Sequence, residues 1–525
     1  MKRLICHAAA LAILLAGGWL PSAQAQSLDQ IGVTLLRAVT TNLNGAGIRV
    51  AQPEASAPTF EVNPAAVGQP TNLFTYASAA GTDTNYPNSV GTESGHADNV
   101  AQLFYGIPTG VATNVAHVDS FDADYFIQNY LLDETTLAPV LAPLPFAVSV
   151  VNQSFTFGSL SVSDQQSVDS AYDDYAEIYA TLFVSAACNY AINPQVCAPG
   201  TAYNCISVGA YGGDSSIGPT IDNGRCKPDL TAPAGETSFS TPQVAGAAAV
   251  LMQAALRGDG GSDTNSAFDM RTIKALLLNG AVKPAGWTNS NSSPLDTRYG
   301  AGVLNIFNSY KQLAGGKQIF CAPNLVSIGS AHLPVTGTNS VAANSGWDFE
   351  NIDSTATNAV VNHYFFNATN GFATATLVWN RQFNQTNIND LDLFLYNCAN
   401  SNLVACSTSR VDNVEHFFVP KLSAGRYDLQ VLKNGGTNVV SDSETYALAW
   451  AFVSPTVSLT KSGMNAVVTW PVYPAGFLVE TATNLAVPVW TTNSLPPSVL
   501  TNSQNSLIFE ATNGSQFFRL RQPNF

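Results

Sequence analysis

Residues 227–251, KPDLTAPAGETSFSTPQVAGAAAVL, decide the fold of the longest part of this chain. After Pro242 the stretch consists almost entirely of Ala, Gly and Val, so small side chains lie on every face of a helix. A surface helix carries one apolar stripe, whereas a helix that is apolar all round lies inside a domain. The stretch therefore predicts a central helix that packs against a sheet and other helices and ends near Arg257 and Gly258.

A serine stands at the start of this helix. Ser238 precedes the run of small residues, where the unpaired backbone N–H groups of a helix start favour negative charge. A serine there can act as a nucleophile, with its own backbone N–H helping to bind an oxyanion. It can equally be the N-cap of a buried helix. The stretch by itself leaves both interpretations open.

Apolar runs and helical segments alternate on the N-terminal side of the chain. Residues 149–155, 181–187 and 204–211 form apolar runs, and residues 163–180 have a helical pattern with Ser and Asp near its start. Continuous apolar strands joined by helices indicate a parallel sheet with both faces covered. We therefore expect an α/β domain over residues 26–320.

After Cys321 the pattern changes to strands and turns without a convincing helix. The strand-like segments are 372–379, 390–396, 426–432, 446–452, 466–470, 476–482, 505–511 and 516–521. A break at Ser454-Pro455 separates the last four from the others. These segments predict two all-β domains of the sandwich or jelly-roll type, over residues 321–455 and 456–525.

The composition limits the possible partners. The 525 residues include 36 acids and 21 bases, which gives a formal net charge of −15 with only 11% charged residues. A sparse, acidic surface argues against nucleic acid or an anionic membrane as the partner.

Residues 1–25 have the features of a cleaved signal peptide. Lys2 and Arg3 precede an apolar run, and Ala23 and Ala25 form the small-x-small pattern of a cleavage site. An uncleaved membrane anchor is the alternative, but the apolar run is short for a span. No later segment approaches ~20 uninterrupted apolar residues, so we expect a secreted monomer without a membrane span.

The cysteine count leaves one thiol without a partner in the same chain. Of the eight cysteines, Cys6 leaves with the signal peptide. Export permits disulfides among the remaining seven. Cys398 with Cys406 is the first expected pair, because they bracket a short polar loop between strand-like runs, and Cys197 with Cys205 is the second.

The opening stretch resembles the serine signature of the subtilisin-like serine peptidases. In that family a Lys-Pro-Asp-x-x-Ala-Pro lead-in precedes Gly-Thr-Ser-x-Ala-x-Pro-x-Val-Ala-Gly, and the matching positions here lie between Lys227 and Gly246. The resemblance implies a subtilisin-like parallel-sheet peptidase domain with Ser238 as the nucleophile. By the same resemblance, SGHADNVAQLFYG implies His96 as the general base, and LFVSAACNYA implies Asn189 as the oxyanion-hole donor.

Three positions depart from the family pattern. GIRVAQPEASAP resembles the family's first strand but carries Glu54 where the catalytic Asp stands, and Asp83 and Asp98 are possible substitutes. Glu236 replaces the Gly before Thr-Ser, and Cys188 replaces the Gly before the oxyanion Asn. The last two changes could narrow or repurpose the substrate groove, so an inactive binding protein remains an alternative.

Two further motifs resemble parts of these proteins. VVNQSF resembles the family's Asn-x-Ser-Leu-Gly strand, which implies that Ser154 and Phe155 line the pocket for the residue before the scissile bond. NDLDL resembles a strand of the jelly-roll appendages that follow some of these domains. Its Asp390 and Asp392 could hold a structural Ca²⁺, or they could alternate on an exposed strand face. The chemistry itself requires no cofactor.

The resemblance as a whole implies a secreted serine endopeptidase that cleaves polypeptides through an acyl-enzyme. One rival is a catalytically weak or inactive binding protein of the cell exterior. A second rival is the related acid peptidase group, which uses Glu with Asp and Ser. Against it, Asn189 stands where that group carries an acid, and His96 stands where that group lacks a His.

Overall fold

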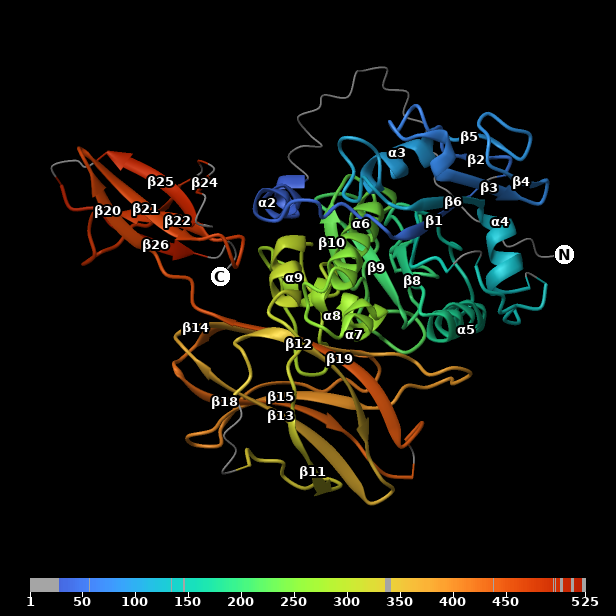
Figure 1. Cartoon of the computed structure of the whole chain (residues 1–525). Helices are drawn as coiled ribbons and strands as arrows, with labels where there is room; N and C mark the ends of the chain where they lie inside the picture. Colours follow the sequence, from blue (N-terminus) through green and yellow to red (C-terminus); the bar gives the residue numbers. More distant parts are fainter. Residues whose placement is uncertain are drawn as a thin grey trace.

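The computed structural model describes residues 28–521, except 56, 134, 145–146, 336–340, 438, 494, 496, 501–503 and 511–513. Figure 1 shows three bodies in chain order: an α/β body in blue to green, a β body in yellow and orange, and a small β body in red. The predicted signal peptide lies outside the described residues. Within those residues, no helix is long and apolar enough to cross a membrane.

The first body is built on an eight-stranded sheet. Its strand order is β10 (Leu230–Pro233), β9 (Cys205–Tyr211), β8 (Leu182–Ala186), β7 (Val150–Gln153), β1 (Arg49–Glu54), β6 (His117–Asp122), β3 (Phe74–Ser78) and β4 (Gly81–Asp83). β4 runs antiparallel to β3, and the other neighbouring strands are parallel. The carboxyl ends of the parallel strands therefore meet at one edge, where polar side chains can gather.

Helices cover both faces of this sheet. They are α2 (Val33–Val39), α3 (Gly95–Phe104), α4 (Ala123–Phe126), α5 (Val162–Tyr179), α6 (Thr237–Leu256), α7 (Thr264–Phe268), α8 (Met270–Gly280) and α9 (Ile306–Leu313), with the short helices η1 (Thr71–Leu73) and η2 (Ile127–Leu131). A two-stranded sheet joins β2 (Thr59–Glu61) to β5 (Thr92–Glu93).

Helix α6 lies in the core, as its small residues predict. Most of its side chains are buried, and the backbone continues through Arg257 to Gly258, which has a φ of +84°. A Cβ added at Gly246 would lie 2.6 Å from the side chain of Val111. Glycine at this position therefore allows close approach to the chain segment beyond α3.

The second body is a sandwich of two antiparallel sheets. One sheet has the order β11 (Cys321–Ser327), β13 (Asn358–Ala368), β18 (Gly425–Lys433), β15 (Leu391–Asn397) and β16 (Leu403–Ser407). The other has the order β12 (Ser345–Asp353), β19 (Ser443–Val453), β14 (Gly371–Trp379) and β17 (Val414–Leu422). Large buried side chains such as Trp379 and Trp450 fill the space between them.

The first two bodies share a continuous apolar core. Trp347 of β12 is fully buried, and its indole N–H donates to the carbonyl of Leu313 in α9 at 3.1 Å. Asn279 of α8 accepts hydrogen bonds from the hydroxyls of Thr374 and Thr376 in β14, both at 3.0 Å. The four-stranded sheet thus packs directly on α8 and α9.

The third body is a smaller pair of antiparallel sheets. One has the order β20 (Ser458–Ser462), β21 (Asn465–Pro471), β25 (Gln504–Glu510) and β24 (Ser498–Leu500), and the other β23 (Thr491–Thr492), β22 (Leu478–Ala482) and β26 (Phe517–Arg521). Its loop between β21 and β22 contacts the first body, where the side-chain oxygen of Asn308 accepts from the backbone N–H of Ala475 at 2.8 Å.

The predicted fold class is confirmed: a parallel-sheet α/β domain precedes antiparallel all-β structure. The predicted boundaries fall between α9 and β11 and between β19 and β20. As limits of independent domains they stay predictions, because the first two bodies share a core.

The two expected disulfides are absent from the structure, in which all seven cysteines of the described residues carry free thiols. Cys406 in β16 lies opposite Phe394, whereas Cys398 follows the end of β15. Cys205 directs its thiol toward backbone carbonyls of the loop that precedes it, such as that of Ala202 at 3.2 Å. A short sequence separation across a turn did not predict facing side chains.

Candidate active site

The end of β1 positions Glu54. The strand is buried along its length, and Glu54 is its last residue, only 2% exposed. The side-chain amide of Gln52, two residues earlier, donates to Oε1 of Glu54 at 3.2 Å and to the carbonyl of Ala97 at 3.0 Å. Gln52 therefore ties the carboxylate to the first turn of α3. Pro53 is accommodated inside β1, which keeps its parallel register with β6 through Glu54.

The first turn of α3 positions His96. Ser94 caps the helix, its hydroxyl oxygen accepting from the backbone N–H of Ala97. Nδ1 of His96 lies 2.8 Å from Oε2 of Glu54. The imidazole is 25% exposed, and its ring centroid lies 5.7 Å from that of Phe239 in α6. One edge of the imidazole thus faces a carboxylate, and the ring packs beside the start of α6.

The surroundings of His96 raise its pKa above the ordinary value. Burial by itself lowers the pKa, but the charge of Glu54 and its hydrogen bond outweigh burial, with a smaller contribution from the charge of Glu236. An imidazole with this environment accepts a proton readily, because Glu54 stabilises the imidazolium.

Ser238 lies in the first turn of α6. Its hydroxyl donates to the carbonyl of Ser154 at 3.2 Å, and the hydroxyl of Ser154 donates to the carbonyl of Ser238 at 2.8 Å. This reciprocal pair joins the start of α6 to the segment that follows β7. For proton transfer to His96, the Ser238 hydroxyl would have to turn from the Ser154 carbonyl toward the imidazole.

Asn189 follows β8 and faces the start of α6. Its side-chain oxygen accepts from the backbone N–H of Thr237 at 3.0 Å and from the Thr237 hydroxyl at 2.8 Å. Because the oxygen is held by Thr237, the NH₂ group is the donor left for a ligand.

Asn189 and Ser238 line the same small cavity of about 20 Å³. The residues around it are Ser154, Phe155, Thr156, Ala186, Cys188, Asn189, Ile192, Thr237 and Ser238. Phe155 is buried at 2% exposure. The cavity holds little more than one water molecule, which is far smaller than an open pocket for a large side chain.

The structure brings together most of the predicted site. Glu54 bonds to His96, Ser154 bonds to Ser238, and Asn189 shares a cavity with Ser238. The substitutes lie elsewhere: Asp98 accepts from the backbone N–H of Asn63, and Asp83 accepts from Asn85.

The sequence analysis did not identify three supporting contacts, which are made by Gln52, Thr237 and Phe239. Thr237 belongs to the quoted motif, so its position carried a signal. Phe239 lies in the same stretch, but at a position that the motif leaves open, and Gln52 carried no signal.

Asp390 and Asp392 lie together on the second body. Both accept hydrogen bonds from the side-chain amide of Asn434 at 3.0 Å. Burial raises the pKa of both carboxyls, that of Asp392 to about 7. Oδ1 of Asp390 is buried without a hydrogen-bond partner. Two carboxylates and an orphaned oxygen are compatible with a hard cation, although the described residues contain no cluster of three or more His, Cys, Asp or Glu ligands.

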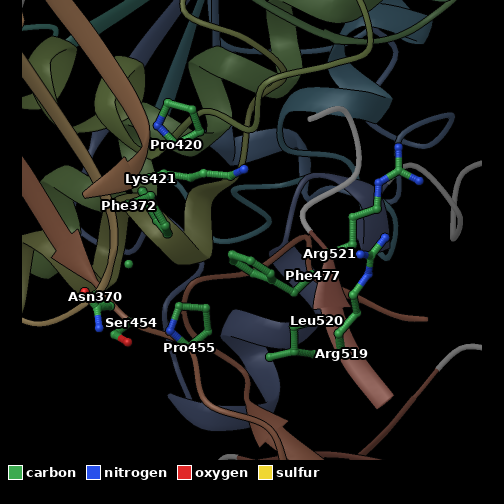
Figure 2. Close-up of a pocket in the computed structure, with 11 residues that line it drawn as sticks. Asn370, Phe372, Pro420, Lys421, Ser454, Pro455, Phe477, Arg519, Leu520 and Arg521 are labelled. Atoms are coloured by element: carbon green, nitrogen blue, oxygen red, sulfur yellow. The ribbon is translucent and has the colours of Figure 1, made fainter. Parts of the chain in front are cut away.

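A larger cavity of about 420 Å³ lies between the second and third bodies, as Figure 2 shows. Phe372 and Phe477 stack with ring centroids 6.2 Å apart. Lys421, Arg519 and Arg521 also line it, and both arginines pair with Glu480. This cavity shares no lining residue with the one beside Ser238.

Comparison with known families gives one match within the first body. Residues 71–302 match the model of the subtilase family of peptidases. The matched range contains His96, Asn189 and Ser238, whereas Glu54 precedes it.

Several solved structures are similar to parts of the chain. A prenylagaramide maturation protease is 18% identical, covering 55% of this chain and 99% of that one, with a TM-score of 0.34. A protease from Pseudoalteromonas arctica is 18% identical and covers 56% of this chain and 97% of that one, with a TM-score of 0.35. Fervidolysin from Fervidobacterium pennivorans, a keratinolytic enzyme, is 13% identical and covers 95% of this chain and 80% of that one, with a TM-score of 0.33.

Proposed function

Because residues 71–302 form a subtilase domain, and hence a serine peptidase domain that acts on polypeptides, we propose that this protein is an endopeptidase in which Ser238, His96 and Glu54 carry the reaction. The single observation that supports this assignment most is the 2.8 Å contact between Nδ1 of His96 and Oε2 of Glu54. A carboxylate in that position fixes the tautomer that leaves Nε2 free to accept a proton.

The proposed reaction begins when His96 takes the proton of the Ser238 hydroxyl. The oxygen of Ser238 attacks the scissile carbonyl, and the NH₂ group of Asn189 donates to the oxyanion that forms. Protonated His96 then gives its proton to the leaving amine, and an acyl-enzyme remains on Ser238. Water hydrolyses the ester with His96 again as the base. Glu54 acts through His96, as a positioning residue.

Secretion is part of the proposal. It is supported by the pattern of residues 1–25, in which a short basic start and an apolar run precede a small-x-small site. N-terminal sequencing of the exported protein tests it, with Gln26 as the expected first residue.

A second candidate function is a catalytically weak or inactive binding protein of the cell exterior. The observation in its favour is the cavity of Figure 2, where aromatic rings and three cationic side chains gather away from the serine. Glu236, placed near His96 in a position where the family resemblance implies Gly, points the same way.

One experiment separates these functions. The mature protein and Ser238→Ala are incubated with denatured casein and, separately, with a fluorophosphonate probe. A peptidase cleaves casein and is labelled, and both activities are lost in the variant. A native protein that binds no probe and leaves casein intact contradicts the peptidase proposal. An optimum at neutral or alkaline pH supports a His base, whereas an acid optimum favours the acid peptidase group.

A further inference from the structure

Two cysteine side chains meet directly behind the candidate oxyanion donor. Cys188 is the residue before Asn189, and its φ of +85° lies in the left-handed region that favours glycine. Cys197 lies in the loop that follows, and the neighbouring Cys197 side chain is the main cause that lowers the pKa of the Cys188 thiol. Both residues are only 2% exposed. The backbone N–H of Cys197 also donates to the carbonyl of Ala187 at 3.2 Å, so the two chain segments run side by side.

Cys188 is part of the wall around the nucleophile. The hydroxyl of Thr156 donates to the sulfur of Cys188 at 3.7 Å, and both residues line the cavity of about 20 Å³ that also contacts Ser238. Asn189 is therefore held by Thr237, and the backbone of Cys197 is bonded to the same chain segment at Ala187.

Cys205, eight residues beyond Cys197, provides a contrast. It is buried as well, at 1% exposure, but its sulfur faces the backbone carbonyls of Pro199 and Ala202 at 3.3 and 3.2 Å. The side-chain nitrogen of Lys227 lies 4.0 Å away. Cys197 thus has Cys188 as its neighbouring thiol and not Cys205.

We propose that Cys188 and Cys197, which carry free thiols in this structure, form a disulfide under oxidising conditions that fixes the chain segment carrying Asn189. The effect on catalysis rests on the proposed function, whereas the bond itself does not. A disulfide here closes a loop of nearby residues, restrains the unfolded chain and limits the movement of the segment between the two cysteines.

The chemistry needs an external disulfide oxidant. One cysteine thiolate attacks a small disulfide and releases one small thiol, and the second cysteine displaces the other half from the mixed disulfide. The protein loses two protons and two electrons, and the oxidant is reduced to two thiols. Since both thiols are buried in the final structure, the bond forms while the chain folds.

The first test maps the cysteines of the full chain. The protein is refolded with oxidised glutathione, its free thiols are blocked with N-ethylmaleimide at acid pH, and it is digested without reductant. We expect a cross-linked pair of peptides that contain Cys188 and Cys197, with the mass of two hydrogens missing, and a blocked thiol at Cys205. Two blocked thiols at positions 188 and 197, or a link between Cys197 and Cys205, would overturn the proposal.

The second test measures the consequence of the bond. Reductant should lower the Tm of the native protein and of the matched control Cys205→Ala by several degrees, and should leave the Tm of Cys197→Ala and Cys197→Ser unchanged. On reduction, the labelling rate of Ser238 by the fluorophosphonate should fall roughly 3- to 10-fold in the native protein and in Cys205→Ala, and should not change in the two Cys197 variants. Equal responses of all four proteins to reductant would contradict the proposal.

If Ser238 is labelled in none of these samples, the proposed peptidase function fails. The peptide map and the Tm comparison then still decide whether the disulfide exists.

Discussion

Nδ1 of His96 lies 2.8 Å from Oε2 of Glu54, across the gap between the first turn of α3 and the carboxyl end of β1. The two residues are 42 positions apart in the chain, and the contact joins a buried carboxylate to a partly exposed imidazole. The contact is compatible with the proposed role of Glu54 as the acidic partner of His96.

Replacing Glu54 tests this contact most directly. Glu54→Gln removes the charge that offsets the effect of burial, so the pKa of His96 should fall and the acid limb of kcat/KM should move to lower pH. The plateau should fall by about 10⁴-fold, because an amide favours the wrong tautomer of the imidazole. Glu54→Asp keeps the charge, so its kcat/KM plateau should lie between that of the native protein and that of Glu54→Gln. A plateau within threefold of the native value would exclude a positioning role for Glu54.

Glu236 contributes less to the same pKa. Glu236→Gln should shift the acid limb of kcat/KM to lower pH by a smaller amount than Glu54→Gln, because the Glu236 charge is a lesser cause of the raised pKa of His96. The matched control is Asp259→Asn, whose carboxylate pairs with Arg257 beyond the far end of α6. The measurement is a pH–rate profile of Glu236→Gln, Glu54→Gln and Asp259→Asn, each compared with the native protein. An identical shift in the control would mean that long-range charge, and not the position of Glu236, sets the effect.

Asn189 should act in the transition state and not in substrate binding. Asn189→Ala should lower kcat by about 10² to 10³-fold with little change in KM, a magnitude known from removal of one oxyanion donor in a subtilisin. Thr237→Val keeps the backbone N–H that orients Asn189 but removes the hydroxyl, so its loss should be smaller. Steady-state kinetics on a peptide substrate separate kcat from KM. A rise in KM alone would instead indicate that Asn189 only binds the substrate.

Gly246 tests the packing that the opening stretch predicts. Gly246→Ala gains about 1 kcal/mol of helix propensity, but the added Cβ meets Val111 at 2.6 Å, and overpacking costs about 1 to 3 kcal/mol. The steric cost should exceed the gain in helix propensity, so the Tm of Gly246→Ala should fall by several degrees. Gly514→Ala is the control, since a Cβ there meets nothing within 4 Å. An unchanged Tm for Gly246→Ala would show that α6 can shift.

The parallel sheet and the central helix could be predicted because their signals are local. Small residues on all faces of α6, and apolar runs at β7, β8 and β9, each require burial on both sides. The strands β12 and β17 gave no such signal, because charged and polar residues such as Asp348 and Glu415 interrupt them. Asp348 accepts a hydrogen bond from the Tyr364 hydroxyl, and Glu415 accepts from Ser407 and Ser409. The sequence pattern does not reveal these partners, which satisfy the buried carboxyls.

The residues of the candidate site also differ in how far the sequence could predict them. Ser238 and Asn189 could be identified because motif residues surround them, whereas the partner of His96 depended on how β1 ends. The pairing of cysteines failed because it was inferred from loop length. The register of β15 with β16 and the direction of the loop after β8 decide which thiols face each other.

Asp392 offers a test of the proposed calcium site. Burial raises the pKa of its carboxyl to about 7 in the folded chain, against about 4 when unfolded. The folded state therefore holds an extra proton between these values, and its stability should fall as the pH rises from about 4 to about 7. Ca²⁺ stabilises the charged form. Millimolar Ca²⁺ should therefore raise the Tm of the native protein at pH 8, and Asp392→Asn should raise it in chelator and abolish the response to calcium.

The matched control is Asp353→Asn, which removes an exposed carboxylate at the end of β12 in the same body. This variant should keep both the calcium response and the loss of stability between pH 5 and pH 8, because its charge is already in water. Thermal unfolding of the three proteins at pH 5 and pH 8, with calcium or chelator, separates the effects. If calcium raises the Tm of Asp392→Asn as much as that of the native protein, the ion binds elsewhere. If calcium has no effect on any of them, Asp390 and Asp392 form only a buried carboxyl pair shared by Asn434.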